Sequence, residues 1–197
     1  VLLDEQDGDA AGVGDLADRV LDLGTFGDGG GRRLCDRPAG DDAVLAKVNK
    51  GETYASTCEA LVKLGAAGIT RSVMILNGLG GPELSAQHAD NSARLLNATQ
   101  PEYVATLVVS FPLGEERFRT GFPGWRALAQ AELFSEMERF LDKLELTRTV
   151  FRSDHASNWL ILKGTLGVDK QRLLELVRQA IRQPEAARLR PEWARGL

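Results

Sequence analysis

The sequence has little cysteine and no excess of positive charge. Cys35 and Cys58 are the two cysteines among its 197 residues, too few for a disulfide framework or a four-cysteine metal site. Its 24 Lys and Arg residues are outnumbered by 28 Asp and Glu residues, and the net charge is -4. A surface for nucleic acid or for an anionic membrane needs a basic excess. We therefore expect no nucleic-acid partner and no membrane partner.

The sequence also lacks a long apolar run. Its longest aliphatic stretches, Ile69–Leu79 and Tyr103–Leu113, have the length of buried strands and fall short of the ~20 residues of a membrane helix. The N-terminal segment is acidic, whereas a secretory signal peptide begins with a basic region. With so few cysteines, these features predict a protein of the reducing cytoplasm.

Composition divides the chain into three parts. Residues 1–42 are rich in Asp and Gly and include Gly29-Gly30-Gly31, which predicts a poorly ordered segment. Residues 43–182 alternate between helical and strand-like patterns and form the predicted folded part. Residues 183–197 contain two prolines and several arginines and are predicted to be a mobile tail.

The middle part alternates between helices and strands. The pattern predicts a helix over Thr53–Leu64 with Thr53 as N-cap, and further helices over Glu83–Ala98, Trp125–Leu144 and Asp169–Arg182. Two apolar runs rich in β-branched residues, Thr70–Asn77 and Tyr103–Ser110, predict buried strands. Such alternation with short connections is typical of an α/β fold in which helical crossovers join parallel strands.

Two segments resemble one enzyme superfamily. The segment Ser72–Ala89, SVMILNGLGGPELSAQHA, resembles the fifth strand and following helix of radical S-adenosylmethionine (SAM) enzymes, in a bacterial group with the motifs G-L-G-G and E-L-S-x-x-H-A. The segment Phe151–Leu174, which begins FRSDHASN, resembles the closing segment of that group. The resemblance extends over residues 40–181 and is strong because both motifs occur at the expected separation.

The resemblance implies the C-terminal strands and helices of a partial (β/α)6 barrel that resembles a TIM barrel. In the family, a 4Fe-4S cluster held by three thiolates cleaves SAM to a 5′-deoxyadenosyl radical. Those thiolates belong to a C-x-x-x-C-x-x-C loop, which this sequence lacks. We therefore expect SAM and the cluster in a complete parent protein, no metal site and no cofactor in this chain alone, and a missing N-terminal half-barrel as its partner.

The resemblance also suggests candidate site residues. Two groups of residues at the carboxyl ends of the fifth and sixth strands are predicted to contact the adenine of SAM: Leu76, Gly78, Gly80, Ser110 and Pro112. Glycine allows a backbone to approach a ligand closely, and barrel enzymes bind ligands at the carboxyl ends of their strands. An ordinary strand-to-helix turn is the alternative interpretation of the same residues.

The polar run from Arg152 to Asn158 is the second candidate. Arg152, His155 and Asn158 are predicted to face an unknown, small-molecule substrate; a hydrogen-bonded loop that ties the last helix to the barrel is the equally weighted alternative. His88 is predicted to be a structural histidine rather than an anion contact, and the glutamates of the long helix to form a solvated face. The catalytic residues are not identified by the sequence.

Upstream of residue 40 the family pattern is lost. Gly-, Asp- and Arg-rich sequence before an abrupt return to the pattern is typical of a shifted reading frame. We therefore hypothesise that residues 1–39 are non-native and that the fourth strand is lost. The alternative function is non-catalytic, namely a small α/β binding or scaffold domain.

Overall fold

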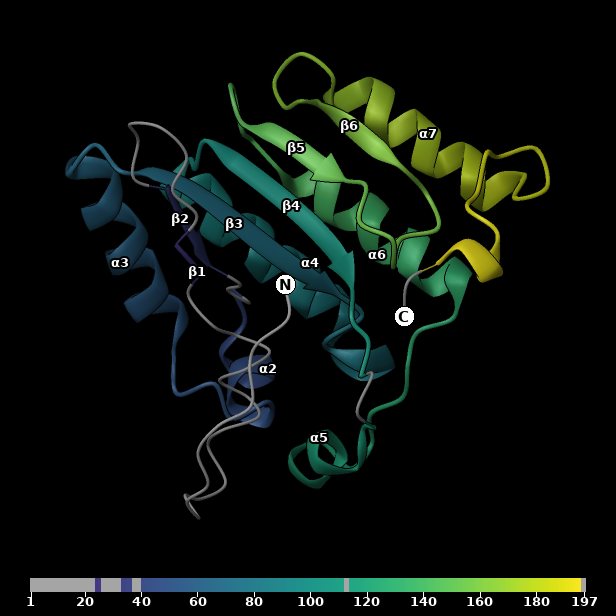
Figure 1. Cartoon of the computed structure of the whole chain (residues 1–197), viewed down its shortest axis with the longest axis horizontal. Helices are drawn as coiled ribbons and strands as arrows, with labels where there is room; N and C mark the ends of the chain where they lie inside the picture. Colours follow the sequence, from purple (N-terminus) through teal and green to yellow (C-terminus); the bar gives the residue numbers. More distant parts are fainter. Residues whose placement is uncertain (1–23, 26–32, 37–39, 112–113, 196–197) are drawn as a thin grey trace, which may run out of the picture.

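The computed structural model describes residues 24–25, 33–36, 40–111 and 114–195. They form one sheet of strand order β1-β2-β3-β4-β5-β6 (Figure 1). Four consecutive strands, β2 to β5, are parallel, and β1 and β6 flank them antiparallel. The strands are β1 (Gly24–Thr25), β2 (Arg33–Asp36), β3 (Thr70–Asn77), β4 (Tyr103–Val108), β5 (Val150–Ser153) and β6 (Leu162–Thr165). The predicted α/β fold with mostly parallel strands is confirmed.

Four helices cover one face of this sheet. In Figure 1, α4 and α6 lie behind the strands, and side chains of α3 and α7 join the same core. The helices are α2 (Asp42–Lys47), α3 (Tyr54–Ala66), α4 (Gly81–Thr99), α5 (Glu116–Gly121), α6 (Gln130–Lys143) and α7 (Lys170–Arg182), followed by the 3-10 helix η1 (Glu192–Ala194). None of the described helices is both long and apolar enough to cross a membrane.

Side chains alternate between the two faces of the sheet, and those on one face form the core. Val73, Val104 and Phe151 lie side by side in the register of β3, β4 and β5, and all three are fully buried beneath the helices. The next row, Met74 and Ala105, points to the opposite face and is half-buried. Successive residues of a strand alternate between faces, so the helices bury one face and leave the other partly exposed.

Several predicted elements agree with the structure, and three differ. The strand predicted over Thr70–Asn77 is confirmed, as is Thr53 as the N-cap of α3. The long helix predicted from Trp125 begins at Gln130, because the Glu132 side chain accepts a hydrogen bond from the Ala129 N–H and caps the helix there.

The other two differences concern the start of the folded part. The fourth strand was predicted to be lost, but β2 pairs in parallel with β3 over four residues. Helix α2 begins at Asp42, inside the segment predicted to be poorly ordered, with buried Asp41 as its N-cap. Residues 1–23 lie outside the described residues, so the hypothesis that the first 39 residues are non-native stays a prediction.

Arg71 joins the elements at the amino end of the sheet. Arg71 is 8% exposed, and its guanidinium donates to the Glu102 carboxylate and to the carbonyl oxygens of Leu61, Thr99 and Gln100. All five N–H donors of this planar group therefore have an acceptor. The side chain ties the end of α4 and the third turn of α3 to the start of β4.

Replacing the Arg71 guanidinium tests whether these hydrogen bonds stabilise the fold. We expect Arg71→Lys to lower the free energy of unfolding by about 3 kcal/mol, because lysine leaves buried acceptors unpaired. Urea denaturation followed by circular dichroism measures the change. Arg119→Lys is the matched control, since Arg119 pairs with Glu115 on an exposed helix and should change stability by less than about 1 kcal/mol. Equal effects of the two variants would contradict the role of Arg71.

Candidate functional site

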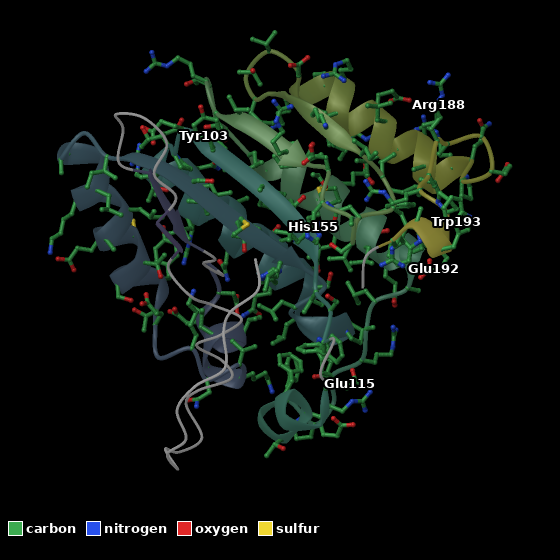
Figure 2. All side chains as sticks on the ribbon, viewed as in Figure 1. Tyr103, Glu115, His155, Arg188, Glu192 and Trp193 are labelled. Atoms are coloured by element: carbon green, nitrogen blue, oxygen red, sulfur yellow. The ribbon has the colours of Figure 1, made fainter. Side chains whose placement is uncertain are left out.

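The predicted site residues gather at the carboxyl edge of the sheet. Leu76 and Gly78 lie at the end of β3, Ser110 follows β4, and His155 follows β5. Figure 2 shows His155 at this end of the strands and Tyr103 at the opposite end. Ligands of open parallel sheets bind at this edge. Pro112 lies outside the described residues.

The glycine turn between β3 and α4 is filled by the chain's own side chains. Gly78 and Gly81 have φ angles of 82° and 58°, a region that favours glycine. A Cβ atom on Gly81 would lie 2.8 Å from Cδ1 of Trp125, and the Trp125 indole N–H donates to the Gly78 carbonyl oxygen at 3.2 Å. Turn conformation and Trp125 therefore require these glycines in the absence of any ligand.

Leu76 and Gly80, two other residues predicted to contact adenine, also pack against the chain itself. Leu76 is buried in an apolar cluster with Val44 and Leu45 of α2. Gly80 is the N-cap of α4 and lies against His88, and Ser110 is half-buried. The structure thus brings these residues to one edge, and their contact with adenine stays a prediction.

A buried carboxylate supports the glycine turn from behind. Glu136 of α6 is 4% exposed; one of its oxygens accepts from the Gly78 N–H at 2.7 Å and the other from the Ser85 hydroxyl at 2.5 Å. The prediction that the glutamates of this helix form a solvated face is wrong for Glu136. Its spacing of three and four residues from Leu133 and Phe140 places it on the apolar stripe, and this was the signal available in the sequence.

His88 lies beside this carboxylate and is itself sealed from solvent. It is 1% exposed, neither ring nitrogen has a hydrogen-bond partner, and Nδ1 lies 4.0 Å from Oε1 of Glu136. Burial lowers the pKa of His88, and the nearby Glu136 and Asp41 carboxylates oppose this shift without reversing it. A neutral ring at 4.0 Å forms no ion pair with Glu136. The burial agrees with the structural role predicted for His88.

Asp41 also lies beside α4, near His88. Burial alone raises the pKa of this carboxyl group, but hydrogen bonds from the Val44 N–H and from the side chains of Asn91 and Gln87 outweigh burial and leave the pKa lowered. Asp41 therefore joins the start of α2 to α4 as an accepting carboxylate.

The three candidate residues in β5 and in the loop after it differ in exposure. Arg152 and His155 are exposed, whereas Asn158 is 3% exposed. The Asn158 amide donates to the Thr106 carbonyl oxygen and to the Ser153 hydroxyl, and its oxygen accepts from the Val108 N–H. Asn158 thus holds the loop on β4, as in the alternative interpretation of a hydrogen-bonded loop. A substrate contact of these three residues stays a prediction.

Two of the cavities lie at opposite ends of the strands. The cavity at the carboxyl edge, lined by Asn77, Ser153 and Asn158 among others, has a volume of about 20 Å³, enough for one water molecule. A larger cavity of about 390 Å³ lies at the amino end, beside Tyr103 and Arg148. Small-molecule sites commonly measure about 300–1,000 Å³. Of these two cavities, the one at the amino end has the volume of a small-molecule site, and the one at the carboxyl edge does not.

The residues present do not fit an iron–sulfur cluster. Within the described ranges, no group of three or more His, Cys, Asp or Glu side chains could hold a metal ion. Cys58 of α3 is a half-buried free cysteine. Any cluster ligands must come from outside this part of the chain.

Comparisons with protein-family models, with curated proteins and with solved structures find no match to this chain. The resemblance to radical SAM enzymes therefore depends on the quoted motifs alone.

The support given by Glu136 can be tested with two variants. We expect Glu136→Leu to increase hydrogen exchange at the Gly78 amide and to lower the free energy of unfolding by about 1–3 kcal/mol, because leucine has no acceptor for either hydrogen bond. Ser85→Ala removes one donor and should leave the Gly78 amide protected. Hydrogen exchange measured by NMR distinguishes them. Unchanged protection of Gly78 in Glu136→Leu would refute this support.

The buried imidazole predicts a pH dependence. A pKa lowered in the folded state means that the unfolded state binds a proton more readily. Stability is therefore full above the unfolded value of about 6.5 and is lost as the pH falls below it. We expect wild type to lose more free energy of unfolding between pH 7 and pH 5 than His88→Leu, measured by urea denaturation at each pH. Parallel pH profiles would contradict the assignment to His88.

Proposed function

We propose that this chain is the C-terminal part of a radical SAM domain, whose parent acts on an unknown substrate in the cytoplasm. One observation carries the proposal. The motif residues from separate parts of the sequence, represented by Gly78, Ser110 and His155, lie at one carboxyl edge of parallel strands covered by helices on a single face. A partial barrel has this arrangement, because its helices lie outside and its ligands bind at the carboxyl ends.

The two outermost strands of the sheet, β1 and β6, differ in a way that supports the proposal. On one side, β6 pairs with β5 over four residues and ends the parallel series. On the other side, β1 pairs with β2 over only two residues. In the proposed parent, the missing N-terminal strands replace the short pairing of β1 at the β2 edge and bury the half-exposed face that includes Met74 and Ala105.

The proposal assigns the cluster to the missing half. The described residues offer no set of three thiolates. This chain would therefore contribute residues that line the SAM site, and the missing half would contribute the iron ligands. We accordingly expect no radical activity from the chain alone.

A binding or scaffold domain is the second candidate. It is favoured by the glycine turn, whose space is occupied by Trp125 and Leu133, and by the small volume of the cavity at the carboxyl edge. In this function, the half-exposed sheet face and the β2 edge would contact a protein partner, without SAM.

Anaerobic reconstitution with iron and sulfide tests the proposal. We expect the chain alone to bind no iron and to release no 5′-deoxyadenosine from SAM. A version extended by the protein encoded upstream, if that region contains C-x-x-x-C-x-x-C, should bind about four irons per chain and release 5′-deoxyadenosine. The control is the extended protein with the three motif cysteines replaced by alanine.

Two outcomes would contradict the radical SAM proposal. An upstream region that encodes no such motif in any frame, or an extended protein that binds four irons without cleaving SAM, would reject the radical SAM proposal. Either result would favour the binding or scaffold function.

A further inference from the structure

Hydrogen bonds fix the tautomer of His155. The backbone N–H of Ser157 donates to Nδ1 of His155 at 3.1 Å, and the Ser157 hydroxyl lies 2.9 Å from the same nitrogen. A backbone N–H can only donate, so Nδ1 must accept and the neutral ring carries its proton on Nε2. The Ser157 hydroxyl also accepts from the Val108 N–H at 3.1 Å. The imidazole is therefore tied to the end of β4, with the Nε2–H left as its donor.

The C-terminal segment holds the same loop from the other side. Arg190 donates to the carbonyl oxygens of His155 and Asn158 at 2.6 and 2.9 Å, and Arg195 donates to that of Ser157 at 3.1 Å. The Arg195 guanidinium also lies 3.2 Å from the centroid of the Trp159 ring. Figure 2 shows Glu192 and Trp193 of this segment beyond the carboxyl end of the sheet. Supporting contacts on two sides are typical of a functional side chain held in one orientation.

These contacts bear on the predicted tail. Residues 183–197 were predicted to be mobile, yet residues 190 and 195 make specific contacts with the His155 loop. The mobility of the whole tail stays a prediction, while its contacts make it part of the support of His155.

Arg152 of β5 supplies a positive charge three residues before His155. It is exposed, and its guanidinium makes no hydrogen bond or ion pair within the part of the chain that the structure describes. Its register partners are Ala105 on β4 and Lys163 on β6. Lys163 pairs with Asp154 at 2.7 Å, whereas Arg152 affects Asp154 only through its charge. Arg152 thus remains available to a ligand.

We propose that Arg152 and the Nε2–H of His155 bind an oxyanion, a carboxylate or phosphate group of the ligand. Both groups are donors at the carboxyl end of β5 and lie beside β4: Arg152 is paired in register with Ala105, and His155 is linked through Ser157 to Val108, three residues further along β4. Guanidinium and imidazole N–H groups form strong charge-assisted hydrogen bonds with such oxygens. Ser157 is no nucleophile for this ligand, because it is 1% exposed. The inference goes beyond the proposed function, since the pair needs neither iron nor SAM.

Nitrogen-15 NMR of the whole chain tests the pair directly. Long-range spectra should show His155 as the Nε2–H tautomer. Titration with inorganic phosphate and, separately, with acetate should shift the His155 ring signals to saturation, and the anion that saturates at the lower concentration identifies the preferred group. We expect Arg152→Gln to weaken this binding by about tenfold or more, as for the loss of a charge-assisted hydrogen bond.

Lys163→Gln is the matched control, because it removes the same charge from the neighbouring strand but from a lysine that already has a partner. It should leave the affinity within about twofold of wild type. The inference is overturned by an Nδ1–H tautomer, by shifts that do not saturate with either anion, or by equal losses in Arg152→Gln and Lys163→Gln. None of these results depends on SAM cleavage, so the pair and the radical SAM proposal can fail separately.

Discussion

A parallel strand has two faces to bury, and the long helices of the described chain cover only one of them. Val73, Val104 and Phe151 show how complete that burial is, since each is fully enclosed between the sheet and the helices. The neighbouring residues Met74 and Ala105 remain half-buried on the other face. Buried parallel strands normally have cover on both sides. This asymmetry underlies both candidate functions. The half-exposed face would be covered by the missing N-terminal strands in the first and by a protein partner in the second.

Polar side chains fix the two ends of this one-sided arrangement. At the amino end, Arg71 bonds to backbone carbonyl oxygens of α3 and α4 and to Glu102. At the carboxyl end, Glu136 holds the glycine turn and Ser85. Apolar contacts set the layers and are not directional, whereas these hydrogen bonds set where each turn lies. The geometry of the candidate site therefore depends on buried polar groups within the protein.

The candidate site contains two kinds of residue that a motif alone cannot separate. Gly78 and Asn158 lie at the expected edge, but their polar atoms bond to the chain itself. Arg152 and His155 lie at the same edge and keep donors for a ligand. A motif can be required by a fold, by a ligand or by both, and only the hydrogen-bond partners distinguish the cases.

The sequence by itself determined the strand over Thr70–Asn77, the start of α3 at Thr53 and the edge at which the motif residues gather. These features depend on apolar periodicity, capping and strand direction, which act over a few residues. Only the tertiary structure decided that Glu136 is buried, that Asn158 faces inward and that Arg190 supports His155. Their partners lie 58, 50 and 35 residues away in the chain. Local patterns carry no information on such pairings, because the pairs form only when the layers pack.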